Sequence, residues 1–430
     1  MELPIFAYIA ILLLAALLST RLMKVLKLPN VTGYIITGII MGPFVFGLFF
    51  NNFTYDGIKE SAIYSYVDKI SWVSTVALGF IAFSIGTSFK VNILKSVGKR
   101  VIVITILEAL FASIMVIIAL MIAHFVNSTE VSWELVLTLG AIASATAPAA
   151  TLMIIKQYNA RGPLVNTLLP VVALDDAAAL ILFAILFQVA STIALGGEFS
   201  VYLMLVKPIL EIIISLAFGV VIGLIISFMN RFFKSRNNRL IWCIFSVFAA
   251  LGLYMLFRYP ECGGFELSSL LMCMMAGAIY TNMCKDSNRT LDVMDRFTSP
   301  IYMMFFVISG ASLDLTIFFN DKGLIVILIA AIYIVARVVG KWLGAFTGAS
   351  ITHSEPQIKK YLGFTLIPQA GVAIGLATTA SKLFSSNPAT LEAGTLIVAI
   401  VLTSTLVYEL IGPMVSKFAL KKAGEIEESK

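Results

Sequence analysis

Long apolar stretches recur along the whole chain, and short segments between them carry most of the charged residues. A membrane-spanning helix needs about 20 mostly apolar residues, and this periodic pattern provides about thirteen such stretches. They lie near 4–22, 32–50, 70–89, 101–125, 134–155, 164–190, 202–229, 240–257, 265–283, 299–313, 322–348, 361–382 and 393–416. The pattern predicts an all-α polytopic membrane protein with about thirteen transmembrane helices.

Composition and charge agree with a chain that lies in a lipid bilayer. Hydrophobic residues make up 60% of the sequence and charged residues 13%, whereas soluble globular proteins contain about 25% charged residues. If the N-terminus lies outside, 22 Lys and Arg residues fall in cytoplasmic segments and 5 in external ones. This asymmetry follows the positive-inside rule, and an odd number of spans then places the C-terminus in the cytoplasm. Topology therefore accounts for the net charge of +6, and we expect no nucleic-acid partner.

Two of the predicted spans contain residues that interrupt a helix. The first has Thr146-Ala-Pro148, and the second has Pro368-Gln369-Ala-Gly371. Proline removes a backbone hydrogen bond and glycine weakens a helix, and irregular backbone survives at membrane depth only where it is buried or lines a cavity.

The two interruptions lie seven spans apart, so the second enters the membrane in the opposite direction. This spacing predicts two inverted six-helix repeats with crossed broken helices, an arrangement that marks the midplane site of secondary transporters. The repeats cover about residues 1–195 and 238–420, joined by a linker helix at about 200–230. We expect one membrane domain over 1–430 with no soluble regulatory domain.

Asp175 and Asp176 are adjacent in an apolar run that has no other charge between Leu164 and Ala190. Ionised side chains at this depth are costly and usually functional. Neighbouring helical positions point about 100° apart, so the two carboxylates cannot face one partner. A buried carboxylate that binds either a proton or a metal cation, never both, is sufficient for coupled antiport. The alternative is a buried polar pair that only stabilises the helix bundle.

Three further charged residues lie inside predicted spans. Arg337 needs a carboxylate partner because an unpaired guanidinium is costly there, and Asp175 and Glu108 are the candidates. Lys341 is one turn further along and is expected to extend to the membrane interface. Glu409 has either a functional or a structural role near the cytoplasmic end.

Uncharged oxygen atoms at the breaks complete the candidate site. Thr146, Thr151 and Gln369 provide such oxygens, which hard alkali cations prefer together with unwound backbone carbonyls. Thr146 is the first choice as a second metal ligand beside Asp176. The four cysteines and two histidines lack metal-binding spacing, and no cofactor is expected beyond the transported Na+ or K+ and H+.

Taken together, several motifs along the chain make it similar to a known transporter family. They are Leu28 to Gly38, Gly42-Pro43, Thr146-Ala-Pro148, Leu174-Asp175-Asp176-Ala, Phe305 to Asp314, Arg337-Val-Val-Gly340, Pro368-Gln-Ala-Gly371 and Glu409-Leu-Ile-Gly412-Pro413. The chain resembles bacterial cation/proton antiporters of the monovalent cation:proton antiporter-2 family, which includes Kef-type and NapA-type transporters.

This resemblance implies a homodimer in a bacterial cytoplasmic membrane that exchanges a monovalent cation, Na+ first and K+ as the alternative, for protons. It assigns Asp176 as the carrier and Asp175 as the partner of the basic residue at Arg337. The chain departs from the family at two positions. Arg337 stands where electrogenic members usually have lysine, and Ala147 stands where related exchangers have an acidic residue.

Two other functions fit the composition less well. An intramembrane aspartyl protease needs aspartates on two different helices, and a sodium-coupled symporter of organic anions favours a polar or basic pocket over an acidic pair. The sequence therefore predicts a transporter, not an enzyme.

Overall fold

The structure is a computed structural model of the whole chain. It describes residues 5–26, 28–50, 62–87, 89, 91–128, 131–195, 206–233, 235–257, 267–284, 287–312, 323–369, 371–384, 387–388 and 390–426. Of the residues named above, Asp314 lies outside these ranges.

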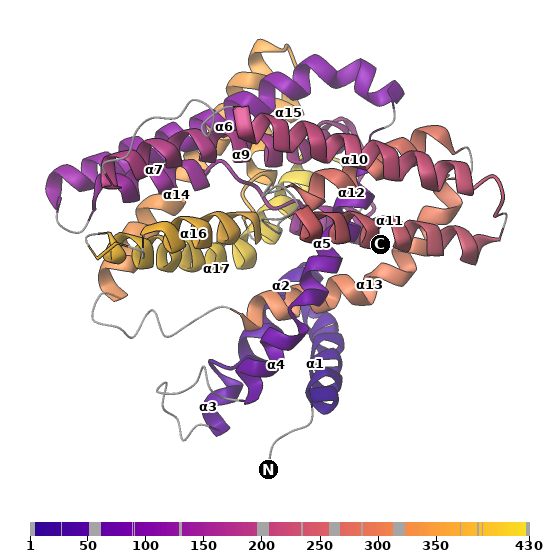
Figure 1. Cartoon of the computed structure of the whole chain (residues 1–430), viewed down its shortest axis with the longest axis horizontal. Helices are drawn as coiled ribbons and strands as arrows, with labels where there is room; N and C mark the ends of the chain where they lie inside the picture. The colour runs from indigo at the N-terminus through magenta and orange to yellow at the C-terminus, as the bar shows by residue number, and fades with distance from the viewer. Residues whose placement is uncertain are drawn as a thin grey trace. The chain divides into compact units, whose positions relative to one another are not determined.

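The described residues form α-helices joined by turns and short extended segments (Figure 1). In chain order they are α1 (Ile5–Val25), α2 (Asn30–Met41), α3 (Phe46–Phe50), α4 (Ala62–Ile70), α5 (Trp72–Gly86), α6 (Val91–Val126), α7 (Trp133–Ile142), α8 (Pro148–Gln157), α9 (Pro163–Leu195), α10 (Lys207–Met229), α11 (Arg236–Phe257), α12 (Ser269–Met283), α13 (Ser287–Ala311), α14 (Gly323–Ile351), α15 (Pro356–Thr365), α16 (Gly371–Phe384) and α17 (Leu391–Lys422).

This architecture confirms the prediction of an all-α polytopic membrane protein. Within the described residues, nine helices are long and apolar enough to cross a bilayer, and three shorter apolar helices lie at Trp133–Ile142, Ser269–Met283 and Val372–Ser381. The total of about thirteen spans remains a prediction. Both interrupted spans divide as expected, one into α7 and α8 and the other into α15 and α16.

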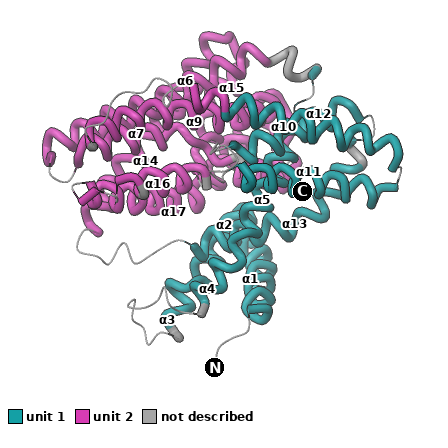
Figure 2. Tube along the Cα trace, in the orientation of Figure 1, with its two compact units in different colours: residues 1–94, 211–316 teal, residues 95–210, 317–430 magenta. Residues whose placement is uncertain are grey.

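The chain divides into two compact units (Figure 2). Unit 1 contains Met1–Leu94 and Glu211–Thr316, and unit 2 contains Lys95–Leu210 and Ile317–Lys430. Each unit thus takes one segment from each predicted repeat, while the inverted relation between the repeats remains a prediction.

Unit 1 is held together by helices that approach closely at glycines. A Cβ added to Gly38 of α2 would lie 2.0 Å from the carbonyl oxygen of Val307 on α13, and one added to Gly310 would lie 2.3 Å from that of Ile35. Only a hydrogen atom fits at such contacts, and small residues are typical of helix pairs in membranes.

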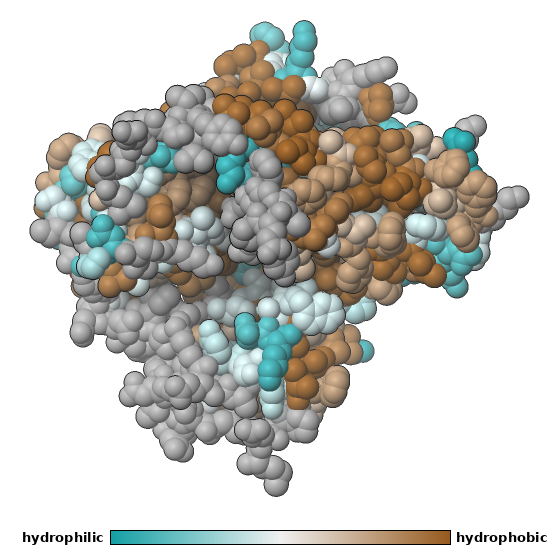
Figure 3. Space-filling model, viewed as in Figure 1, coloured by the Kyte–Doolittle hydropathy of each residue, from teal (hydrophilic) through white to brown (hydrophobic). Residues whose placement is uncertain are grey.

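The outer faces of α10 and α11 carry exposed apolar side chains, and Figure 3 shows hydrophobic residues gathered over these helices. Ile213 and Phe228 of α10 and Ile241 and Phe248 of α11 are among them. In water this area would be costly, and a bilayer removes that cost.

Candidate cation/proton site

Two extended segments cross in unit 2, one between α7 and α8 and the other between α15 and α16. Ala147 is extended, with φ −93° and ψ 113°, because the following Pro148 disfavours helical backbone at the preceding residue. Its N–H donates to the carbonyl of Pro368 over 2.8 Å, and the Thr151 hydroxyl donates to the carbonyl of Thr365 over 3.1 Å. The predicted crossing of two broken helices is therefore present.

Arg337 of α14 joins the carboxyl ends of both broken helices. Its guanidinium is fully buried and donates to the carbonyls of Ala143 at 2.9 Å, Ala145 at 2.7 Å and Ile367 at 2.7 Å. The carboxyl end of a helix carries partial negative charge and unpaired carbonyls. One rigid cation thus satisfies groups that would otherwise be unpaired in an apolar interior.

Three further residues complete this network around Arg337. The side-chain amide of Gln369 donates to the carbonyl of Ile142 over 2.9 Å and contacts the Tyr333 hydroxyl at 3.0 Å. The Arg337 guanidinium carbon lies 4.7 Å from the ring centre of Tyr408. The crossing is therefore tied to α14 and α17 by side chains as well as by its own backbone.

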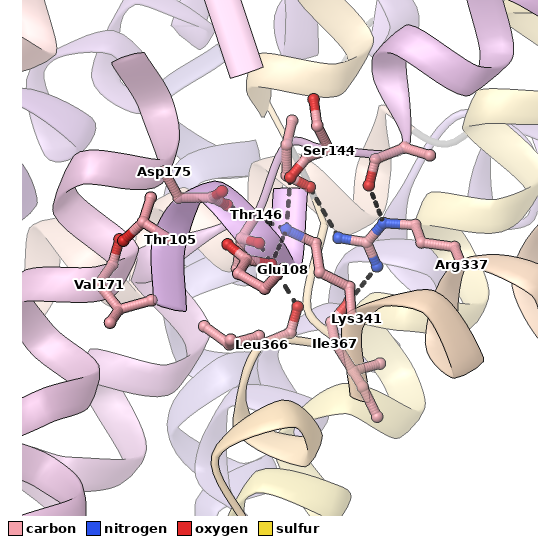
Figure 4. Close-up of polar contacts among 12 residues, drawn as sticks. Thr105, Glu108, Ser144, Thr146, Val171, Asp175, Arg337, Lys341, Leu366 and Ile367 are labelled. Atoms are coloured by element: carbon pink, nitrogen blue, oxygen red, sulfur yellow. Dashed lines mark hydrogen bonds and ion pairs between the residues drawn. The ribbon is translucent and has the colours of Figure 1, made fainter. Parts of the chain in front are cut away.

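Lys341 is the residue that pairs with the buried carboxylates (Figure 4). Its ammonium lies 2.6 Å from Oε2 of Glu108 on α6 and 3.2 Å from Oδ2 of Asp175 on α9, and all three side chains are fully buried. It also donates to the carbonyl of Ser144 at the crossing. One cation therefore bridges three elements: α6, α9 and the first broken helix.

This arrangement corrects two predictions. Arg337 was expected to pair with Asp175 or Glu108, but it binds backbone carbonyls instead. Lys341 was expected to reach the membrane interface, but it is buried and pairs with both carboxylates. The two basic residues are one turn apart on one face of α14. The carboxylates of Glu108 and Asp175 lie at the level of Lys341, so each basic residue finds a different partner.

Close packing of α14 against α6 brings Lys341 to Glu108. Gly340, Gly344 and Gly348 repeat at four-residue spacing, and a Cβ added to Gly344 would lie 2.5 Å from the Cα of Glu108. Small residues at this spacing allow two helix backbones to approach. The glycine row thus sets the depth at which the lysine and the glutamate meet.

Asp176, the predicted carrier, is buried beside this ion pair but not in it. Its Oδ1 atom has no hydrogen-bond partner among the described residues, and both Asp175 and Lys341 act on it electrostatically. Thr146 is buried at the crossing and its hydroxyl approaches the Leu366 carbonyl at 3.5 Å. The prediction that Asp176 and Thr146 together bind a metal ion stays a prediction.

The remaining predicted residues lie at the breaks or beside them. Pro148 is the first residue of α8, Gly371 is the first residue of α16, and Pro368 lies in the second extended segment. Glu409 is buried in α17, the helix that packs on α8, α14 and α15. Unit 2 thus holds every residue of the predicted site.

Comparison with known proteins identifies the class of transporter. The family of transmembrane sodium/hydrogen exchangers matches residues 9–417. This chain belongs to the sodium/hydrogen exchanger family. The exchanger is therefore a membrane transporter that exchanges a cation for protons, as its buried acidic pair and crossed broken helices predicted.

Solved structures show the same fold. The chain resembles an electron-microscopy map structure of the sodium proton antiporter MjNhaP1 from Methanocaldococcus jannaschii, with a TM-score of 0.71 and 20% identity over 100% of both chains. A second structure of that antiporter, at pH 8, has a TM-score of 0.61 and 19% identity, over 97% of this chain and 98% of the other. No curated protein sequence matches the exchanger.

Sequence reasoning missed the central role of Lys341, although a signal for it was present. Residues four apart on a helix share a face, so an inward-facing Arg337 already implied an inward-facing Lys341. The contributions of Tyr333 and Tyr408 had no comparable signal, because tyrosines at span depth are more often simple packing residues.

Proposed function

We propose that the exchanger carries Na+ and H+ in turn on the carboxylate of Asp176, by alternating access from the two sides of the membrane. The observation that carries this proposal is the difference between the two aspartates. Oδ2 of Asp175 is held by Lys341 at 3.2 Å, whereas the buried carboxylate of Asp176 forms no ion pair with the described residues. Oδ1 has no hydrogen-bond partner among the described residues in either aspartate, so only Asp176 is left without a bound cation. A buried carboxylate oxygen with a free lone pair accepts either a proton or a cation.

Oxygen atoms of the crossing would complete the shell around the cation. The hydroxyl oxygen of Thr146 keeps lone pairs for a ligand when it donates to Leu366. Unwound carbonyls and half-helix ends coordinate Na+ in transporters built from broken helices. Because Arg337 already occupies three of these carbonyls, the cation has fewer available, and Asp176 becomes the dominant charge.

We further propose that exchange is electrogenic. A lysine beside the acidic pair can release its proton, whereas an arginine cannot. The family resemblance of the sequence assigned Arg337 as the basic partner of Asp175, but the basic residue that pairs with Asp175 is Lys341. The pairing of Lys341 with two carboxylates supports a site that gains or loses more than one proton per cation.

The transporter group, the oligomeric state and the location follow from the resemblance of the sequence motifs to the monovalent cation:proton antiporter-2 family. We propose that the exchanger is of the Kef-type and NapA-type group, that it is a homodimer, and that it lies in a bacterial cytoplasmic membrane with its N-terminus outside. The excess of positive charge in the predicted cytoplasmic segments supports this orientation. The exposed apolar faces of the helices fit lipid and leave room for a second copy.

The test is proton flux in proteoliposomes with the membrane potential clamped, comparing Na+, K+ and Li+. Wild-type protein should release protons in response to Na+, and Asp176→Asn should abolish this flux. Asp175→Asn should weaken it or alter its coupling. Asp292→Asn, the same change on the exposed side of α13, is the control and should exchange normally.

Three results would contradict what is proposed. Retained Na+-driven proton flux in folded Asp176→Asn would remove this residue as the carrier. Equal losses from Asp175→Asn and Asp176→Asn would contradict the division of roles between them. A flux that does not respond to the clamped potential would argue against electrogenic exchange.

A further inference from the structure

The chain turns back on itself directly after α17. Gly424 has a positive φ of +76°, its N–H donates to the carbonyl of Lys421 over 3.0 Å, and the N–H of Glu425 donates to that of Leu420 over 3.1 Å. These two bonds and the left-handed glycine define a Schellman motif. The motif gives Glu425 a set position at the end of α17.

The carboxylate of Glu425 caps the amino end of α9. Its Oε1 accepts the N–H of Leu164 at 2.6 Å and its Oε2 accepts that of Val165 at 2.8 Å. The residues at the start of α9 cannot do this themselves, because Gly162 has no side chain and Pro163 has no N–H. A carboxylate at this end of a helix also meets the positive pole of the helix dipole.

Backbone contacts reinforce this cap. The carbonyl of Glu425 accepts the N–H of Arg161 at 3.0 Å. Gly162 has a φ of +156°, and a Cβ at this position would lie 2.4 Å from the carboxyl carbon of Glu425. The loop before α9 is thus shaped to receive this side chain, which is 6% exposed.

We propose that Glu425 is a positioning residue for exchange, clamping the helix that carries Asp175 and Asp176 to the end of α17. α17 packs on α8, α14 and α15, so the clamp links the aspartate helix to both broken helices and to the helix of Lys341. Asp176 lies thirteen residues into α9, roughly 20 Å from the clamp at 1.5 Å per residue. This inference rests on the proposed exchange at Asp176.

The ionisation of Glu425 gives the clamp a pH signature. Burial raises the pKa of this carboxyl, its amide hydrogen bonds to Val165 and Leu164 oppose the rise, and Glu355 at the start of α15 adds to it. The other charged neighbours in sequence are Arg161 in the adjoining loop, Lys421 and Lys422 in the last turn of α17, and Glu427 and Glu428 shortly after Glu425. On acidification Glu425 becomes neutral at a higher pH than a free glutamate, and it then resembles glutamine.

The experiment compares exchange by reconstituted full-length variants as a function of Na+ concentration and pH. Glu425→Gln should lower the maximal rate about threefold to tenfold, the range that the free energy of a helix cap converts to. The KM for Na+ should stay within twofold, because the cation site is distant. The ratio of wild-type to variant rates should be largest at alkaline pH and should fall on acidification.

Two further variants separate a clamp from general damage. Gly162→Ala should slow exchange by displacing the Glu425 side chain, and Gly162→Ala with Glu425→Ala should be no slower than Gly162→Ala alone. Glu355→Gln is the matched control: Glu355 is exposed at the amino end of α15 and makes no capping hydrogen bond. Its maximal rate should equal that of the wild type at alkaline pH, where Glu425 is ionised in both proteins.

An unchanged maximal rate in folded Glu425→Gln, or fully additive losses in the double variant, would overturn the clamp. A loss that is the same at every pH would also contradict it. These failures differ from a failure of the proposed function, because wild-type protein would still exchange and Asp176→Asn would still be inactive.

Discussion

The ion cluster at Lys341 allows a sharp prediction about stability. Lys341→Gln leaves Glu108 and Asp175 without their shared cation, and both carboxylates are fully buried within 2.6 and 3.2 Å of the lost ammonium. Removing one partner of a buried ion pair costs about 3–5 kcal/mol, because the remaining charge is desolvated and unpaired. The variant should therefore lose about that much unfolding free energy.

Restoring the charge balance should recover part of this loss. The variant Glu108→Gln with Lys341→Gln has the same net charge as the wild-type cluster, because it removes one cation and one anion together. We expect it to be about 1–3 kcal/mol more stable than Lys341→Gln alone, the usual coupling between contacting residues. Lys360→Gln, on the exposed side of α15, should change stability by less than about 0.5 kcal/mol.

The measurement is reversible unfolding of purified protein in detergent micelles, followed by tryptophan fluorescence at constant pH. The reasoning would be refuted if Lys341→Gln were as stable as Lys360→Gln. It would also be refuted if the double variant were less stable than Lys341→Gln, because the carboxylates would then not depend on the lysine.

Two other substitutions test the packing around the crossing, using the same unfolding assay. Arg337→Lys replaces the rigid guanidinium, which donates to three carbonyls, by a single flexible ammonium. Each lost hydrogen bond of a charged group should cost about 1.5–3 kcal/mol of unfolding free energy. An unchanged stability would show that the guanidinium is dispensable. Gly344→Ala forces a Cβ to within 2.5 Å of the Cα of Glu108 and should cost about 1–3 kcal/mol by overpacking. Gly252→Ala, with no atom within 4 Å of the added Cβ, is its control and should not be destabilised.

The position of the membrane helices and of their breaks could be predicted from the sequence because both depend on local properties. A run of about 20 apolar residues must become a helix in lipid, since no water is present to satisfy its backbone. Pro148 and Pro368 weaken the helices that contain them, because proline has no N–H to donate, although Pro170, Pro300 and Pro413 lie inside continuous helices. The acidic pair could be found in the same way, since charge at membrane depth is costly wherever the helix lies.

The choice of partners could not be predicted, because it depends on the depth at which separate helices meet. The sequence indicated Arg337 as the basic partner of Asp175 and placed Lys341, one turn further along the same helix, at the membrane interface. The clamp by Glu425 was equally invisible, since it joins residues separated by more than 250 positions along the chain.

The sequence by itself therefore determined that this chain spans a membrane, breaks two of its helices and buries an acidic pair, each a consequence of apolar runs, proline and charge. Only the tertiary structure decided that Lys341 pairs with Glu108 and Asp175 while Arg337 binds the broken helix ends. The physical reason is the row of glycines on α14, which sets how closely α6 approaches and so which cation reaches the carboxylates.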